Sequence, residues 1–238
     1  LTRIYKRKGS LDDLKNYRFI HGKDWMPKLL EKLVVDKIAQ NIRENTSETQ
    51  IGGMKGKSTR DHLMTCILAM REYERRRKPL MYLLVDITKC FDKVRLDDLV
   101  YESLQAGCSP AVVKFVEALS QDTIIKLRGM GRDDLSRLIK NSVGQGTDFA
   151  VLLTSYIIGL IIEKFFKNGQ EWLTKMVIRG AKIPPLAYVD DINLMTDKER
   201  KLRDLAEKLT EALNYISLRA NNKKTKVIVI GNNKEARQ

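Results

Sequence analysis

Cysteine and histidine are scarce in this sequence. It contains three cysteines, Cys66, Cys90 and Cys108, and two histidines, His21 and His62. Because the cysteine count is odd and no C-x-x-C pair occurs, neither a disulfide framework nor a zinc knuckle is expected, and a reducing, intracellular compartment (nucleus or cytoplasm) fits best. Two isolated histidines exclude histidine-based metal or triad chemistry. The first residue is not methionine and no signal-like apolar segment follows it, so we interpret the chain as a piece excised from something longer.

Long apolar runs and acidic residues are scarce as well. The longest apolar stretch, residues 149–162, is interrupted by Thr154 and Ser155, so it predicts a buried helix and no membrane partner. The 30 Asp and Glu residues are outnumbered by 44 Lys and Arg residues, which gives a net charge of +14. With 43% hydrophobic residues a disordered chain is excluded. The positive charge indicates a polyanionic partner, for which nucleic acid is the expected class; a basic protein without such a partner is the alternative.

The hydropathy pattern predicts helices first and a mixture of strands and helices afterwards. Residues 1–23 are basic and read as irregular. Helices are expected over 25–42, 59–73, 95–106, 110–120, 149–166 and 198–216. Strands are expected over 80–87, 123–129 and 226–231, and a hairpin over 184–195 with two aspartates at its turn. Strands that alternate with helices after residue 80 indicate an α+β fold of the split β-α-β kind.

Pairs of adjacent aspartates occur four times, so the dipeptide by itself is uninformative. Three of the pairs lie in polar surroundings, at 12–13, 97–98 and 133–134. Asp190-Asp191 differs because it lies between two apolar arms, and Asp86 similarly ends an apolar strand. Buried carboxylates need a compensating cation, usually a hard divalent ion with oxygen ligands. These three aspartates can hold two magnesium ions, which activate an attacking hydroxyl and stabilise a leaving phosphate oxygen, so together with the basic charge they predict nucleotidyl transfer on a nucleic acid.

Six segments form an ordered set of motifs along almost the whole chain. They are KNYRFI (15–20), QIGGMKGKSTRDHL (50–63), VDITKCFDKV (85–94), GQG (144–146), AYVDDINLM (187–195) and NNKKTKVIVIG (221–231). Together they resemble the motifs of reverse transcriptases, with AYVDD in the place of their Y-x-D-D box. The second segment is most similar to the fingers motif of non-LTR retrotransposon and group II intron enzymes, and it favours a non-LTR origin.

The resemblance implies a right-hand polymerase with fingers at 1–80 and a palm at 81–231. In this reading the palm is a split β-α-β (ferredoxin-like) antiparallel sheet with packed helices. Residues 232–238 would be the start of a primer-grip and thumb region that is missing, which makes the chain a fingers–palm fragment. The implied activity is RNA-directed DNA polymerisation with an RNA template, a DNA primer and dNTPs. The implied cofactors are two Mg²⁺ ions, for which Mn²⁺ can substitute.

The resemblance also assigns catalytic roles to four residues. Asp86, Asp190 and Asp191 match the catalytic carboxylates that bind the two metal ions. Lys224 matches the late lysine that protonates pyrophosphate as it leaves; a solvated lysine at a strand edge is the alternative.

Three further residues match positions that contact the incoming nucleotide. Phe91 falls on the steric gate, where an aromatic ring blocks a ribose 2′-hydroxyl; a core phenylalanine is the alternative. Gln145 falls on the nucleotide-contacting position of the GQG motif. Arg18 would hold the triphosphate, because a guanidinium fork matches phosphate oxygens.

Two departures and two rival functions accompany this resemblance. After GQG the chain continues with Thr147-Asp148-Phe149 in place of the usual Pro-Leu-Ser-Pro region, and Gly53 stands where the fingers motif usually has Phe. An RNA-dependent RNA polymerase-like palm is one rival, although Gly-Asp-Asp is more usual there and a bulky gate favours deoxynucleotides. A non-catalytic reverse-transcriptase-like nucleic-acid-binding module is the other, although such a module need not keep three aspartates.

Overall fold

A computed structural model of the chain describes residues 2–20, 25–44, 46–105, 107–120, 123–126, 136–139, 148–169 and 171–231. The helices are α1 (Trp25–Glu44), α2 (Thr59–Arg75), α3 (Cys90–Lys93), α4 (Leu96–Gln105), α5 (Pro110–Ser120), α6 (Asp148–Phe166), α7 (Glu199–Tyr215) and the 3₁₀ turn η1 (Leu14–Asn16). The strands are β1 (Thr2–Tyr5), β2 (Tyr17–Ile20), β3 (Leu80–Asp86), β4 (Thr123–Lys126), β5 (Ser136–Ile139), β6 (Lys167–Asn168), β7 (Glu171–Trp172), β8 (Met176–Ile178), β9 (Ala181–Ile183), β10 (Leu186–Tyr188), β11 (Asp191–Thr196) and β12 (Lys226–Ile230).

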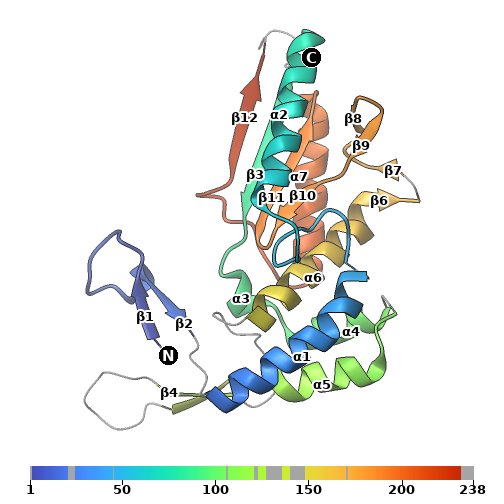
Figure 1. Cartoon of the computed structure of the whole chain (residues 1–238). Helices are drawn as coiled ribbons and strands as arrows, with labels where there is room; N and C mark the ends of the chain where they lie inside the picture. The colour runs from blue at the N-terminus through green and yellow to red at the C-terminus, as the bar shows by residue number, and fades with distance from the viewer. Residues whose placement is uncertain are drawn as a thin grey trace.

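The central sheet has four strands in the order β10-β11-β3-β12, and every neighbouring pair is antiparallel (Figure 1). β3 occupies an inner position because its sequence, LMYLLVD, is apolar on both faces and is buried almost throughout. The β3–β11 register places Leu83 opposite Leu194 and Asp86 opposite Asp191. The two aspartates therefore lie at the same end of the sheet.

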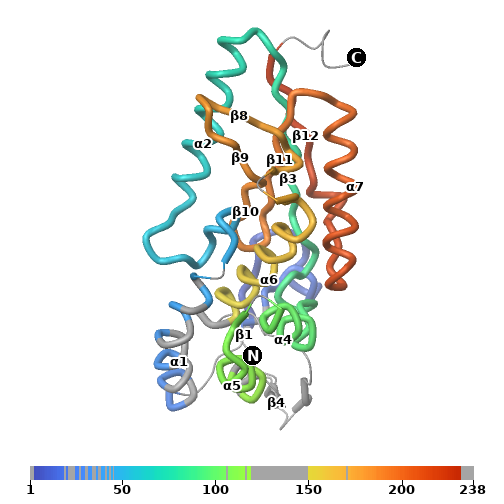
Figure 2. The backbone as a smooth tube through the Cα atoms, turned by 90° about the vertical axis from the view of Figure 1, so that its right-hand side faces the viewer, coloured from blue at the N-terminus to red at the C-terminus, as the bar shows by residue number. Residues whose placement is uncertain are grey.

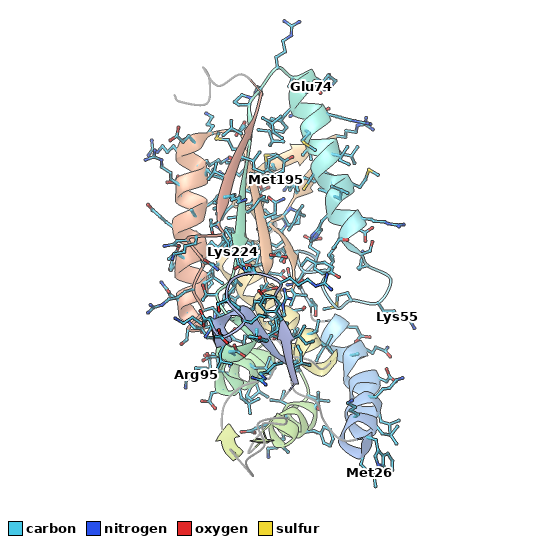
Figure 3. All side chains as sticks on the ribbon, turned by 90° about the vertical axis from the view of Figure 1, so that its left-hand side faces the viewer. Met26, Lys55, Glu74, Arg95, Met195 and Lys224 are labelled. Carbon is cyan, nitrogen blue, oxygen red and sulfur yellow. The ribbon has the colours of Figure 1, made fainter. Side chains whose placement is uncertain are left out.

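Helices cover both faces of the sheet, which lies between α2 on one side and α7 on the other in Figure 2. Leu83 and Leu194 belong to the main core, which they form with buried residues of α6 and α7. On the opposite face Tyr82 and Met195 pack with Ala69 of α2, and Figure 3 labels Met195 between the sheet and that helix. The α+β class and the antiparallel split β-α-β arrangement expected from the sequence are confirmed.

The long elements lie close to where the sequence predicts them. α6 is deeply buried, as its apolar sequence indicates, and no helix within the described ranges is long and apolar enough to cross a membrane. The interpretation of residues 1–23 as irregular is wrong, because β1 and β2 form an antiparallel hairpin there. Tyr5 and Tyr17 make a tilted ring contact across it with ring centroids 5.4 Å apart, while the intervening basic residues hide the alternation from a hydropathy pattern. The short pairs β6–β7 and β8–β9 were not expected either, since strands of two or three residues carry no readable period.

The start of α2 generates a prediction about stability. Ser58 caps the helix with its hydroxyl, and the Asp61 carboxylate accepts a hydrogen bond from the Ser58 N–H at 2.7 Å, which completes a capping box. Ser58→Ala is expected to lower the free energy of unfolding by about 1 kcal/mol, whereas Ser58→Gly costs only a few tenths. Urea unfolding of the three proteins measures both changes. Equal stability of the wild type and Ser58→Ala would show that the cap contributes nothing.

Candidate active site

Three aspartates gather where β3 ends and β11 begins. Asp86 is the last residue of β3, Asp191 is the first residue of β11, and Asp190 occupies the turn between β10 and β11. Because β10 and β11 are joined by only two residues, Asp190 has to lie beside the Asp86–Asp191 pair. The hairpin with an Asp-Asp turn that the sequence predicts is therefore present.

An open cleft of about 630 Å³ lies over this end of the sheet. Asp86 and Asp191 line it together with three lysines, Lys223, Lys224 and Lys226. His62 at the start of α2 and Tyr188 of β10 also border the cleft. Figure 3 labels Lys224 at the edge of the sheet. Acidic and basic groups thus share one solvent-accessible cleft, which suits a ligand that carries both metal ions and phosphates.

A tight turn between α7 and β12 supplies two partners for Asp86. The backbone N–H groups of Lys224 and Thr225 donate to the Asn221 carbonyl at 2.9 and 2.8 Å, while the Asn221 N–H donates to the Asp86 carbonyl at 2.7 Å. Lys224 Nζ donates to Asp86 Oδ1 at 2.6 Å. Asn221 Nδ2 donates to Asp86 Oδ2 at 3.1 Å. Both carboxylate oxygens are therefore held by side chains three residues apart.

Asn221 is a site residue that the sequence reasoning missed. The signal was available, because Asn221 opens the same N-x-x-K-T segment in which Lys224 was singled out. A spacing of three residues across a turn can bring two side chains to one acceptor. Only the structure shows that this acceptor is Asp86.

The negative charge at this site is incompletely compensated. Burial raises the pKa of Asp190 above its usual range, and the charges of Asp191 and Asp86 raise it further. Burial and the charge of Asp86 likewise raise the pKa of Asp191, while the Lys224 ammonium opposes the rise. Three carboxylates that repel one another are a favourable environment for an added cation.

The donor set fits a hard divalent cation. Carboxylate oxygens are the ligands that Mg²⁺ prefers, and burial, together with neighbouring carboxylates, raises the pKa of Asp190 and Asp191, so an added cation would stabilise their charged forms. Within the part of the chain that the structure describes, no three His, Cys, Asp or Glu side chains already converge into a metal-binding group. One Asp86 oxygen is taken by Lys224 instead. The chemistry of the residues fits the ion, which Asp86, Asp190 and Asp191 would hold.

The turn that carries Asp190 is strained. Val189 has a φ of 56°, in the left-handed region that a β-branched residue rarely adopts. Such a conformation costs about 1–3 kcal/mol and persists only where the surroundings impose it. The surroundings here are supplied by residues 49–52, which hydrogen-bond to the hairpin. The position of Asp190 therefore depends on a segment that precedes β3.

The three residues expected to contact the incoming nucleotide lie in different parts of the chain. Phe91 lies on α3, is partly buried and belongs to neither apolar core formed by the described residues. Arg18 is exposed on β2, and no ion pair joins it to a carboxylate among the described residues. Gln145 lies outside the described residues. The structure thus brings together Asp86, Asp190, Asp191 and Lys224, and it does not bring Arg18 to them.

An antiparallel sheet with helices on both faces and carboxylates at one end is the fold of right-hand polymerases. The family model for reverse transcriptase (RNA-dependent DNA polymerase) matches residues 4–237, so the chain belongs to the reverse transcriptase family. It is 27% identical over 168 residues to a retrovirus-related Pol polyprotein from the type-1 retrotransposable element R2 of Bradysia coprophila; the match covers 70% of this chain and 18% of the relative. The expected resemblance to reverse transcriptases of the non-LTR type is confirmed.

Solved structures share the fold at low sequence identity. Apo telomerase from Candida tropicalis, truncated from its C-terminal domain, matches with a TM-score of 0.64 and 13% identity over 92% of this chain and 49% of that one. Telomerase from Candida albicans in complex with a TWJ fragment of telomeric RNA matches with a TM-score of 0.57 and 10% identity over 88% and 34%. The chain thus spans half or less of these relatives. The fingers–palm fold is confirmed, while the boundary between residues 80 and 81 stays a prediction.

Replacing Asp190 by Asn tests the electrostatic description of the site. Because the folded-state pKa of Asp190 is raised, its ionisation opposes folding, so the free energy of unfolding without metal falls as pH rises above the usual aspartate value of about 3.9. We expect Asp190→Asn to weaken this fall and to leave the melting temperature at pH 7 unchanged or higher. Asp97→Asn, at the start of α4 beside Arg95, is the control. It removes a carboxylate that a helix N-terminus favours, so it should lower the melting temperature slightly. Melting curves between pH 4 and pH 8 compare the three proteins. A loss of stability in Asp190→Asn at pH 7 would contradict the description.

Proposed function

We propose that this chain is an RNA-directed DNA polymerase domain that adds dNTPs to the 3′-hydroxyl of a DNA primer paired with an RNA template. The observation that carries the proposal is the gathering of Asp86, Asp190 and Asp191 at one end of the sheet, in a chain that belongs to the reverse transcriptase family. The cleft over these residues is open to solvent and bordered by lysines, as a site for a polyanionic substrate requires.

The three aspartates would hold two divalent cations, Mg²⁺ or Mn²⁺. When bound, such ions activate the attacking hydroxyl and stabilise the leaving phosphate oxygen. Asn221 orients the Asp86 carboxylate through its amide, and Lys224 is paired with the other oxygen of the same carboxylate, from which it would turn to the substrate. The Lys224 ammonium would then donate a proton to the leaving pyrophosphate. Lys223 and Lys226 would contact phosphates of the nucleic acid or the nucleotide along the same cleft.

The remaining parts of the proposal follow the family assignment. Residues 1–80 would be the fingers and residues 81–231 the palm. Phe91, Gln145 and Arg18 would contact the incoming nucleotide. The net charge of +14 supports binding of a template–primer duplex, because each neutralised phosphate releases condensed counterions.

Primer extension tests the proposed activity directly. The wild-type chain is supplied with an RNA template and a labelled DNA primer, with dNTPs or rNTPs, and with Mg²⁺ or EDTA. We expect extension only with dNTPs and Mg²⁺. Asp86→Asn should reduce the rate by at least about 10³-fold, because the metal chemistry is lost, while Asp97→Asn retains it.

Each other outcome of this assay points to a different function. Efficient extension with rNTPs would support an RNA polymerase-like palm instead. Duplex binding without extension, unchanged in Asp86→Asn, would support a non-catalytic binding module. Extension that survives Asp86→Asn would remove this aspartate from the site.

Phe91 generates a separate prediction about sugar selection. A ring at this position would block a ribose 2′-hydroxyl, so Phe91→Val should lower the dGTP/rGTP ratio of kcat/KM by about tenfold or more. Because Phe91 is only partly buried, the loss of melting temperature should be smaller than for a fully buried core phenylalanine. A core phenylalanine would behave differently, since its truncation costs about 3–5 kcal/mol and lowers both activities together. An unchanged ratio with a large loss of melting temperature would assign Phe91 to the core.

A further inference from the structure

The segment before α2 adds a short fifth neighbour to the central sheet. The Ala187 N–H donates to the Thr49 carbonyl at 2.8 Å, and the Ile51 N–H donates to the Ala187 carbonyl at 3.0 Å. Gln50 thereby forms an isolated parallel bridge with Ala187 of β10. Figure 2 shows the blue segment after α1 running beside β10. This contact fixes residues 49–51 against the hairpin that carries the aspartates.

The Gln50 side chain continues from this bridge to the hairpin turn. Gln50 is buried, with 2% of its surface exposed. Its Oε1 accepts hydrogen bonds from the N–H of Val189 at 2.8 Å and from the N–H of Gly52 at 2.8 Å. Its Nε2 donates to the Val189 carbonyl at 3.0 Å. One side-chain amide therefore satisfies both backbone groups of Val189, and we call this set of three hydrogen bonds the Gln50 clasp.

The clasp acts on the one residue of the turn whose backbone is strained. Val189 adopts its left-handed φ of 56° immediately before Asp190. Nothing in a valine side chain favours this conformation, so the two-residue hairpin turn and the contacts around it have to impose it. Because backbone geometry at Val189 sets the direction in which the chain enters Asp190, the clasp also sets the place of that carboxylate.

Two glycines allow the clasp to form. A Cβ on Gly52 would lie 2.4 Å from the Val189 nitrogen, so only glycine lets the segment approach the turn this closely. A Cβ on Gly159 of α6 would lie 3.1 Å from the Gln50 Cβ, so α6 packs directly behind the side chain. Gln50 is therefore confined between a rigid helix and the turn.

We propose that Gln50 is a positioning residue that holds the Asp190 turn in the geometry needed for divalent-cation binding. The inference deepens the proposed function and rests on it. Gln50 does not line the cleft over the aspartates, and it acts through Val189. Its amide is specific for this task, because one group has to accept from an N–H while the other donates to a carbonyl of the same residue.

Three variants of the full chain separate positioning from ordinary structural support. Gln50→Leu keeps much of the volume and removes the clasp. Gln50→Glu keeps an acceptor for the two N–H groups and loses the donor. Thr49→Val is the matched control, since it removes a buried hydrogen bond to Ser47 in the same segment, at 3.1 Å, without touching the turn.

The first measurement is the affinity for Mn²⁺, which is determined by calorimetry and electron paramagnetic resonance. Loss of an outer-shell partner typically weakens metal affinity by 10–100-fold, so we expect about tenfold weaker binding in Gln50→Leu, a smaller loss in Gln50→Glu and none in Thr49→Val. In primer extension, Gln50→Leu should lower kcat by about 10–100-fold and leave the KM for dNTP unchanged. Adding Val189→Asn to Gln50→Leu should recover part of the Mn²⁺ affinity, because Asn tolerates the left-handed conformation.

Specific outcomes overturn the inference. Unchanged Mn²⁺ affinity in Gln50→Leu would show that the clasp does not position the site. Equal losses in Gln50→Leu and Thr49→Val, in proportion to their melting temperatures, would make Gln50 a structural residue only.

Failure of the proposed function has a different signature. A wild-type chain that binds Mn²⁺ but extends no primer contradicts the polymerase assignment, and the Mn²⁺ comparison still decides the role of Gln50. A wild-type chain that binds no Mn²⁺ contradicts the metal assignment. In that case hydrogen exchange at Val189 and Asp190 decides whether the clasp holds the turn: faster exchange in Gln50→Leu alone supports it, and equal exchange in all variants refutes it.

Discussion

The antiparallel pairing of β3 with β11 is the constraint on which the site depends. Side chains alternate between the two faces of a strand, so a slip of one residue would turn the whole set to the other face. The register is secured by apolar burial, since Leu83 and Leu194 face each other in the main core. Once these residues are in place, Asp86 and Asp191 have to meet at the end of the sheet. Packing in the core therefore determines the spacing of charges at the surface.

The site concentrates negative charge in a strongly positive protein. Asp190 and Asp191 are raised in pKa mainly by burial, and the neighbouring carboxylates add to the rise. Lys224 and Asn221 hydrogen-bond to Asp86, and the Lys224 ammonium also opposes the pKa rise of Asp190 and Asp191. The arrangement leaves the two adjacent aspartates underneutralised, as a cation-binding site requires, while the surrounding lysines remain available for phosphates. The ionised carboxylates that would bind a cation are thus the same groups whose ionisation lowers the stability of the fold.

The aspartates were predictable from the sequence because each interrupts or ends an apolar strand, where a charge has no structural reason to be. The helices were predictable because their apolar periods are long. Gln50 begins the motif at residues 50–63, but a glutamine in a glycine-rich loop gives no sign of its contact with Val189, which lies 139 residues further along the chain. The β1–β2 hairpin was missed for a related reason: its aromatic pair joins Tyr5 to Tyr17, and no local pattern expresses that. Contacts made by single polar side chains over long distances are visible only in the fold.

The position of β3 within the sheet has a consequence for how the chain is made. Its partners, β11 and β12, begin at residues 191 and 226, while β3 ends at residue 86. The first of these partners follows 191 − 86 = 105 residues later. At a synthesis rate of about 5–20 residues per second, the apolar strand β3 therefore waits roughly 5–20 s with both hydrogen-bonding edges open. During that interval unpaired apolar edges are the places where nascent chains associate with one another. The same order that brings two distant aspartates together leaves one edge of β3 unpaired until residues 226–230 have been made.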